Sequence, residues 1–224
     1  AGGDHLSITL SMHELSKVVV TTPGATKWYK ANQKSASQHI NISLQEHSHI
    51  DFLPQENIFF DASSAQNQIV ISQDKKASCI GWDISQLGRT AQGETWEKAY
   101  LKNGIEYYFE NELCWVESAV LSAKDSLYKS SCALEQFPVF GTMWLCSESA
   151  NEELVEELAS HLEWNQQLRM GITRISLEHQ SGLILIRGVS EEVEYLKNRF
   201  IQIWLTVREQ ISGLSPQALR IWNT

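Results

Sequence analysis

Apolar and polar residues alternate with a period of two in several short segments of the first 146 residues. This spacing places the apolar side chains on one face of a strand and the polar side chains on the other. The clearest segments are 6–10, 39–44 and 68–72, and stretches rich in aromatic and β-branched residues follow at 106–109, 113–116 and 139–145. Many short strands in succession are typical of all-β architectures. We therefore predict a mainly β body over residues 1–146, built as stacked sheets that resemble a β-helix or a sandwich.

The apolar period lengthens to three or four residues where the chain continues into residues 147–224. Leu154 and Leu158 then recur on one face of a predicted helix. Ser149 and Glu152 have the spacing of a capping box, in which a hydroxyl and a carboxylate satisfy the free N–H groups at a helix start. This pattern predicts a helix that begins after Ser149.

Two strands and a second helix are predicted to follow. Residues 172–177 and 183–186 have strand composition and are separated by a polar turn. The second helix is expected to begin with Ser190 as its N-cap and to end at Gly213. Because no linker rich in Pro, Gly or Ser divides the chain, we predict a single domain over 1–224 that ends in a helix–strand–strand–helix part with two C-terminal α-helices.

The composition narrows the class of protein. The 224 residues include 27 acidic and 18 basic side chains, so the formal net charge is −9. An acidic balance argues against a nucleic-acid-binding protein, which needs a basic face. No apolar run approaches the roughly 20 residues that span a bilayer, and the four cysteines are scattered without a Cys-x-x-Cys pair. These features predict a cytoplasmic protein that binds neither nucleic acid nor membrane.

Tryptophan and histidine offer two hypotheses about binding. Eight tryptophans could form a platform for sugars, but most of them lie in or beside predicted strands and helices, which favours packing in the core. His47 and His49 stand two positions apart, so in a strand they would share one face and could bind nickel or zinc. We favour a polar turn over residues 46–51, because no third ligand lies at a fixed spacing.

Carboxylates that follow predicted turns are the strongest candidates for chemistry. Asp4, Glu56, Asp83 and Glu94 each come after a glycine, a proline or a glycine–tryptophan pair. Such residues either cap turns or act in a functional site. The segment 21–27, Thr-Thr-Pro-Gly-Ala-Thr-Lys, adds a tight turn lined by hydroxyl groups. No ordered Ser/Cys–His nucleophile pattern and no phosphate-binding loop are present in the sequence.

Taken together, these motifs resemble the UreD family of urease accessory proteins, which is called UreH in some bacteria. The resemblance rests on the order and spacing of short motifs along nearly the whole chain. They are Gly2-Gly3-Asp4, Thr21-Thr22-Pro23-Gly24-Ala25-Thr26-Lys27, Leu53-Pro54-Gln55-Glu56, Gly81-Trp82-Asp83, Leu87-Gly88-Arg89, Gly93-Glu94 and Arg220-Ile221-Trp222-Asn223-Thr224. The family normally has further strands ahead of the Gly-Gly-Asp motif, so the chain is expected to lack its first strands and to leave a sheet edge uncovered.

The resemblance implies a urease maturation factor rather than an enzyme. A protein of this type is a scaffold or chaperone that binds apo-urease, the helical protein UreF and, through UreF, the GTPase UreG. The resemblance also implies a complex with UreF that is doubled around a two-fold axis. No cofactor is expected to be tightly bound, and Ni²⁺ would pass transiently through a polar internal passage to urease. An acidic protein suits such a cargo because it attracts cations.

Site residues follow from the same motif match. The nickel-passage candidates are Asp4, Thr22, Thr26, Glu56, Asp83 and Glu94, and the residues expected to shape the backbone are Gly2, Gly3, Pro23 and Gly24. Trp222 is the candidate for a partner contact. The alternative hypothesis from another class is a β-rich glycan-binding or hydrolase module that uses its tryptophans and carboxylates.

Overall fold

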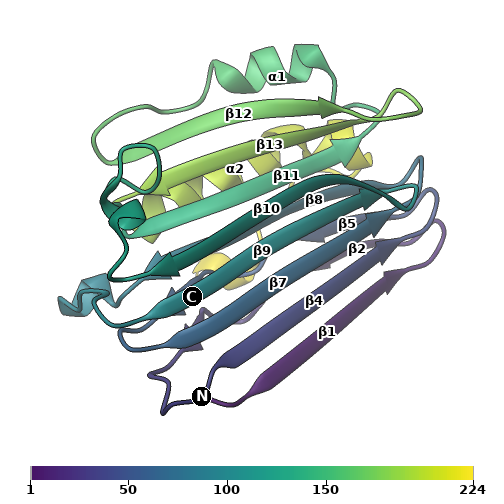
Figure 1. Ribbon diagram of the computed structural model, residues 1–224. Coiled ribbons are helices and arrows are strands. Elements are labelled where there is room, and N and C mark those ends of the chain that lie inside the picture. The colour runs from purple at the N-terminus through teal and green to yellow at the C-terminus, as the bar shows by residue number, and fades with distance from the viewer. Residues whose placement is uncertain (1, 224) are drawn as a thin grey trace.

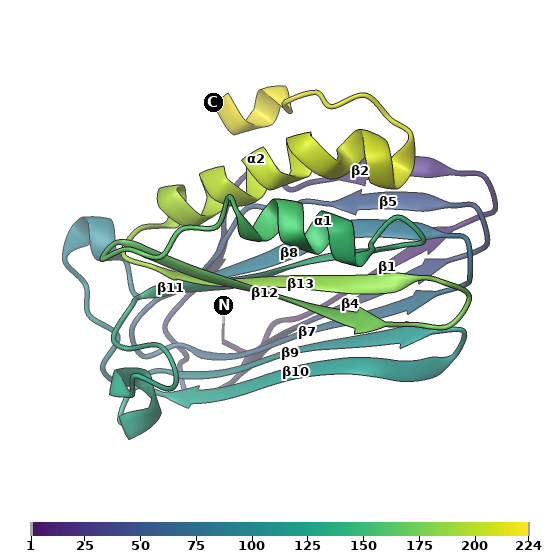
Figure 2. The same ribbon diagram turned by 90° about the horizontal axis from the view of Figure 1, so that it is seen from above.

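Two β-sheets lie face to face, and both α-helices pack on the outer face of the second sheet (Figures 1 and 2). A computed structural model describes residues 2–223. The first sheet has the order β1 (His5–Met12), β4 (Ala36–Leu44), β7 (Ser64–Gln73), β9 (Tyr100–Phe109) and β10 (Glu112–Ser122). The second sheet has the order β12 (Leu168–Ser176), β13 (Gly182–Ser190), β11 (Val139–Ser147), β8 (Ser78–Leu87), β5 (His49–Phe52) and β2 (Lys17–Val20).

Shorter elements complete the fold. β6 (Asn57–Phe59) pairs with both β8 and β3 (Thr26–Trp28). The helices are α1 (Glu152–Ala159) and α2 (Val193–Ser212), with short 3₁₀ turns η1 (Thr90–Gln92), η2 (Ser126–Lys129) and η3 (Arg220–Asn223). None of the helices in the described part of the chain is long and apolar enough to cross a membrane.

The chain winds between the two sheets like a β-helix before it changes to antiparallel pairing. β1, β4, β7 and β9 pair in parallel on the first sheet, and β2, β5 and β8 do so on the second. The later pairs are antiparallel: β10 pairs with β9 on the first sheet, and on the second sheet β11 pairs with β8 and β13, and β13 with β12. The predicted mainly β fold with stacked sheets and two C-terminal helices is confirmed.

Strand β8 is the longest strand that neither the alternation nor the composition predicted. Nearly all of its residues are buried, because one face packs on α2 and the other faces the first sheet. A strand that is buried on both faces has no regular alternation of apolar and polar residues. The short strands β3, β5 and β6 were also absent from the prediction, since three or four residues carry little periodic signal.

Both predicted helix starts are wrong by two residues. The N-cap of α1 is Asn151, whose side chain accepts a hydrogen bond from Leu154 N, so Ser149 does not cap the helix. Ser190 ends β13, and Glu192 occupies the N-cap of α2 without a side-chain cap. The predicted C-terminus is confirmed, because Gly213 adopts the left-handed conformation there with φ of 68°.

The Asn151 cap gives a simple stability prediction. Replacing Asn151 with Ala removes the acceptor for Leu154 N and leaves a free donor at the start of α1. We expect the free energy of unfolding to fall by about 1 kcal/mol, which urea denaturation can measure. An Asn151→Ser variant should stay close to the parent because serine is also a good N-cap. Equal loss in both variants would contradict the capping role.

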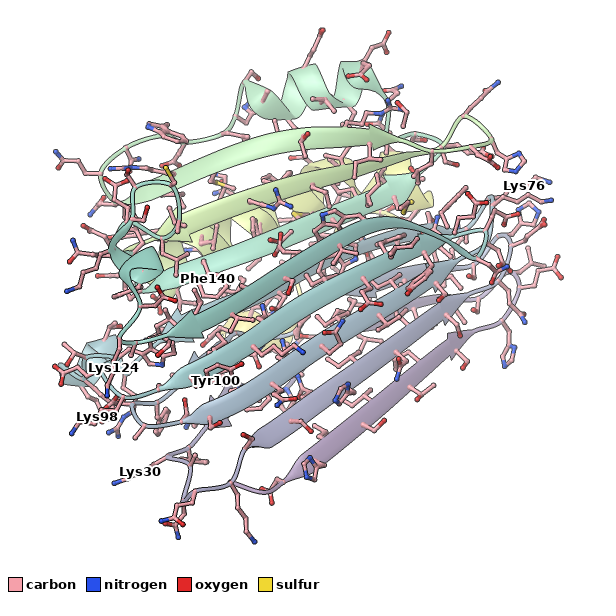
Figure 3. The ribbon with its side chains drawn as sticks, in the orientation of Figure 1. Lys30, Lys76, Lys98, Tyr100, Lys124 and Phe140 are labelled. Carbon is pink, nitrogen blue, oxygen red and sulfur yellow. The ribbon has the colours of Figure 1, made fainter. Side chains whose placement is uncertain are left out.

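The space between the two sheets holds two apolar clusters. One cluster includes Tyr107 and Trp144, and the other includes Trp28, Phe59 and Trp96. Six tryptophans are buried, as the core interpretation predicts: Trp28, Trp82, Trp96, Trp115, Trp144 and Trp204. Turns with Lys30, Lys98 and Lys124 lie at one end of the molecule and Lys76 lies at the other (Figure 3). A band of polar side chains separates the two clusters.

Candidate functional site

Three amides form a hydrogen-bonded row across the inner face of the first sheet. Gln38, Asn67 and Asn103 occupy the same register position on β4, β7 and β9. Gln38 Nε2 donates to Asn67 Oδ1 over 3.1 Å, and Asn67 Nδ2 donates to Asn103 Oδ1 over 2.9 Å. All three side chains are buried. The parallel pairing of the three strands makes this row possible, because it places the three amide residues side by side in register.

Asp83 continues the row onto the second sheet. Asp83 lies on β8 and is only 4% exposed. Its Oδ2 accepts from Asn103 Nδ2 over 3.0 Å, and its Oδ1 accepts from Asn57 Nδ2 over 2.9 Å. Asn57 Oδ1 in turn accepts from Trp28 Nε1 over 3.0 Å. We call Gln38, Asn67, Asn103, Asp83 and Asn57 the polar layer.

The environment of Asp83 disfavours its charged form. Burial raises the pKa of Asp83 to about 6, and the nearby Glu117 carboxylate adds to this rise. The hydrogen bonds donated by Asn103 and Asn57 act in the opposite direction because they stabilise the carboxylate. The layer therefore holds a carboxyl group that titrates close to neutral pH.

This pKa predicts how stability depends on pH. Folding raises the pKa of Asp83 from an ordinary value near 3.8 to about 6. The stability that the protonated group contributes is fully present below pH 4 and is lost as the pH rises through 6. The loss is about 3 kcal/mol, since one pKa unit corresponds to about 1.4 kcal/mol. Urea denaturation between pH 4 and 7.5 should show a smaller decline for Asp83→Asn than for the parent chain, and parallel curves would contradict it.

Glu117 and Thr142 continue the polar residues toward β10. Thr142 on β11 is the register partner of Asp83, and its Oγ1 donates to Glu117 Oε1 over 2.7 Å. Glu117 Oε2 accepts from Arg187 Nε over 2.7 Å. Because the Arg187 side chain is 52% exposed, this end of the row reaches the surface. Ser85 on β8 is the register partner of Asn57. Its hydroxyl oxygen is buried and has no hydrogen-bond partner in the described part of the chain.

Three predicted site residues meet in the loops beside Asn57. Thr22 Oγ1 accepts from Gln55 N over 2.9 Å, and Thr26 N donates to Glu56 O over 2.9 Å. Thr26 is also the register partner of Asn57. Glu56 Oε2 lies 3.2 Å from Lys197 Nζ on α2, so its charge is balanced. Thr26 therefore lies beside the polar layer and Thr22 in the turn that precedes it, whereas the Glu56 carboxylate faces α2 on the outer side of the second sheet.

The other two predicted carboxylates lie apart from the layer. Asp4 is exposed just before β1, and its carbonyl accepts from Ser37 N. Glu94 is held by Arg89, with 2.8 Å between Arg89 Nη2 and Glu94 Oε1. Hydrogen bonds from Arg89 hold the pKa of Glu94 below its ordinary value, against a smaller opposing effect of burial. Glu94 thus orders the loop after β8.

Gly2, Gly3 and Gly24 differ in how strongly the local structure restricts the residue type. Gly3 has φ of +94°, a conformation that other residues rarely adopt. A side chain at Gly2 would come within 2.8 Å of Lys34 O. Gly24, beside the exposed Pro23, has open space around it and an ordinary φ. Other residue types are therefore disfavoured at Gly3 by its φ and at Gly2 by the close contact, whereas the surroundings of Gly24 impose no such restriction.

His47 and His49 do not share a face, so the paired-imidazole hypothesis is wrong. His47 is exposed in a turn with φ of 60°, whereas His49 is buried at the start of β5. The turn predicted over 46–51 is only partly correct, because His47 lies in a turn but residues 49–51 belong to β5. His49 Nδ1 lies 2.7 Å from Ser78 Oγ. Residues 2–223 contain no group of three or more His, Cys, Asp or Glu placed to hold a metal ion.

His49 belongs instead to a buried charged cluster that fixes α2 on the second sheet. Its Nε2 lies 3.1 Å from Asp51 Oδ1, which also accepts from Trp204 Nε1 over 2.9 Å. Asp51 Oδ2 accepts from Arg208 Nε over 3.0 Å. Burial by itself raises the pKa of Asp51, but the close contact with His49, the hydrogen bond from Trp204 and the charge of Arg208 keep it below its ordinary value.

Trp222 packs against two core tryptophans. Its ring centre lies 5.8 Å from that of Trp82 and 5.4 Å from that of Trp204. The residue is partly buried and covers part of α2, where the C-terminal segment runs back along the helix (Figure 2). The predicted partner contact would therefore involve only the exposed remainder of this side chain. Thr224, the last residue of the C-terminal motif, lies outside the described residues.

Comparison with known sequences identifies the family. The family profile described as UreD urease accessory protein matches residues 1–223. The chain belongs to the UreD family. The urease accessory protein UreD of Cupriavidus pinatubonensis is 37% identical over all of this chain and 77% of its own length. The UreD of Cupriavidus necator is 35% identical with the same coverage, and that of Bordetella pertussis is 31% identical over all of this chain and 79% of its own length.

Membership of the UreD family supports a role in urease maturation.

Most members of the polar layer were not predicted from the sequence. Gln38, Asn67, Asn103 and Asn57 are ordinary polar residues in their segments, and Glu117 lies in an aromatic strand. One signal was available: Gln38 and Asn67 stand at inward positions of alternating strands, where apolar residues are normal.

Proposed function

We propose that this UreD-family chain is a non-catalytic scaffold that helps to deliver nickel to apo-urease. It binds apo-urease and UreF, which brings the GTPase UreG, in a cytoplasmic assembly that is doubled around a two-fold axis. Nickel passes through transiently, and no cofactor is held permanently. The observation that carries this proposal is a continuous row of hydrogen-bonded polar side chains, with Asp83 at its centre, between two apolar clusters.

The chemistry of the polar layer suits a passing divalent cation. Ni²⁺ accepts oxygen ligands, and amide and carboxylate oxygens bind it less tightly than thiolates or clustered imidazoles. Asp83 supplies a negative charge inside the protein, and Ser85 Oγ is a buried oxygen that is not already engaged. A cation that enters beside Glu117 therefore meets oxygen atoms along the row toward Thr26 without being trapped by three strong ligands.

A host that produces urease but lacks its own UreD-family protein tests the proposal. Expression of this chain together with UreF and UreG should restore urease activity and the nickel content of purified urease. The chain should also co-purify with UreF and with apo-urease. Restored activity without any association, or association without any gain in nickel content, would contradict the scaffold and delivery role.

A further inference from the structure

The contact between Arg187 and Glu117 lies where a row of polar residues on the second sheet reaches the surface. Asp83 on β8, Thr142 on β11 and Arg187 on β13 are neighbours in register, so their side chains point to the same face of the sheet. Glu117 joins this row from β10 on the first sheet. The next position in register, Gly171 on β12, is exposed and has no side chain. Arg187 is therefore the last side chain of the row before the surface.

Both carboxylate oxygens of Glu117 are engaged in this arrangement. Its Oε1 accepts from Thr142 Oγ1 over 2.7 Å, and its Oε2 accepts from Arg187 Nε over 2.7 Å. Besides burial, the charge of Glu117 raises the pKa of Asp83, so the two carboxylates lie within reach of each other's charge. They form two successive steps for a cation that moves along the row. Because Arg187 stands on the surface side, it occupies an oxygen that a cation from solution would need.

A cavity of about 420 Å³ lies outside the pair and has no excess of negative charge. Arg187 and Glu117 line it, together with a second ion pair between Arg169 and Glu135. In the first pair the positive member is the more exposed one, since 52% of the Arg187 side chain and 24% of the Glu117 side chain are accessible. A cation that arrives from solution therefore meets a guanidinium before it meets a carboxylate, and like charges repel.

The contact can open without disturbing the fold. Among the described residues, only Glu117 accepts a hydrogen bond from the Arg187 side chain. The guanidinium also lies 5.9 Å from the centre of the Trp115 ring. An ion pair with an exposed arginine is weak, because water solvates the guanidinium when it rotates outward. The pair is therefore an equilibrium between a closed and an open arrangement.

We propose that Arg187 is a gate that keeps free divalent cations out of the polar layer. In the closed arrangement it holds Glu117, and in the open arrangement it leaves Glu117 free to pass a cation on to Asp83. Arg187 thus determines selectivity, because an ion in solution is repelled whereas nickel delivered into the cavity enters when the pair opens. The inference rests on the proposed function, since a gate has a role only if nickel crosses the layer.

Ni²⁺ binding by the full chain tests the gate. Arg187→Gln removes the positive charge and should bind Ni²⁺ about tenfold more tightly than the parent chain, because a pair that is closed about nine-tenths of the time lowers the apparent affinity tenfold. Titration calorimetry at about pH 7.5, where the Asp83 carboxyl is ionised, measures the affinity. Arg187→Lys keeps the charge and should bind like the parent chain. A gain in Arg187→Lys as large as that in Arg187→Gln would contradict a gate that acts through charge.

Arg89→Gln is the matched control. Arg89 and Glu94 form an ion pair of similar exposure, 40% and 21%, but they lie apart from the polar layer. The control variant also frees a carboxylate, yet it should bind Ni²⁺ no more tightly than the parent chain. An equal gain in Arg89→Gln and Arg187→Gln would mean that any freed carboxylate binds the ion, which overturns the gate. The absence of a gain in Arg187→Gln overturns it as well.

A double variant shows whether the ion reaches the polar layer. Adding Asp83→Asn to Arg187→Gln should abolish the gain in affinity, because the ion loses the carboxylate that follows Glu117. A gain that persists would leave the ion at the surface and overturn the gate. Thermal denaturation checks that each variant is folded before its affinity is compared.

The outcomes separate the two proposals. The titrations use the chain without partners, so they decide the gate whatever happens to urease. If the parent chain does not restore the nickel content of urease in the host that lacks its own UreD-family protein, the proposed function fails. If it does so while Arg187→Gln binds Ni²⁺ like the parent chain, only the gate fails.

Discussion

Asp83→Asn is expected to lower nickel-dependent activation of urease by about tenfold or more, because each 1.4 kcal/mol added to the barrier for cation passage slows it tenfold. The substitution keeps the size of the side chain but removes the charge at the centre of the polar layer. In an environment that excludes water, the attraction between a carboxylate and Ni²⁺ is large compared with that of an amide. The loss should appear in the nickel content of urease and in its activity.

A matched carboxylate variant separates passage from general damage. Asp74→Asn makes the same change in the turn between β7 and β8, outside the polar layer. It should activate urease like the parent chain. The Asp83→Asn chain should still co-purify with UreF and apo-urease, because Asp83 is buried and a partner protein cannot contact it directly. Normal activation by a folded Asp83→Asn chain would show that the layer only stabilises the fold.

Asp51→Ala is expected to destabilise the protein by about 3–5 kcal/mol, because it leaves the Arg208 charge buried without its partner. Asp51 is fully buried, and it accepts hydrogen bonds from Trp204 and Arg208 on α2. The same change removes the acceptor for the buried Trp204 indole. Thermal denaturation should show a melting temperature lower by about 6–20 °C, since 1 kcal/mol shifts it by about 2–4 °C in a chain of this size.

A double variant distinguishes the loss of a pair from the burial of one charge. Asp51→Asn with Arg208→Met removes both charges but keeps an acceptor for Trp204 Nε1. We expect this variant to lose less stability than Asp51→Ala alone, because no buried charge is left unpaired. A double variant that is less stable than Asp51→Ala would contradict this explanation.

The same cluster predicts weakness in acid. The pKa of Asp51 is lowered on folding, so the stability it contributes is present above its unfolded pKa of about 3.9 and is lost as the pH falls through the folded value. Asp51 and Asp83 therefore act in opposite directions. Rising pH through 6 weakens the fold through Asp83, and falling pH below about 4 weakens it through Asp51.

The β fold and the family were predictable from the sequence, because each depends on local order along the chain. Alternation with a period of two predicted β1, β4 and β7, strand-like composition predicted most of the other long strands, and helical spacing predicted both helices. The order of motifs such as Gly81-Trp82-Asp83 gave the family, which the match over residues 1–223 confirms. These signals lie within short segments, so they can be read without knowing which segments become neighbours.

The polar layer was decided only by the tertiary structure. Gln38, Asn67 and Asn103 are separated by 29 and 36 residues, and their hydrogen bonds exist because parallel winding brings three strands into one register. Asp83 was singled out from its motif, but its partners and its raised pKa come from burial between two sheets.

The ion pair between Arg187 and Glu117 was also decided by the tertiary structure. The two residues are 70 positions apart in the chain, and they meet because β10 of the first sheet comes close to β13 of the second. The sequence by itself determined which elements form and which family they belong to. The assembly of those elements determined which polar groups are buried together and which ion pair lies at the end of the row, because both depend on contacts between residues far apart in the chain.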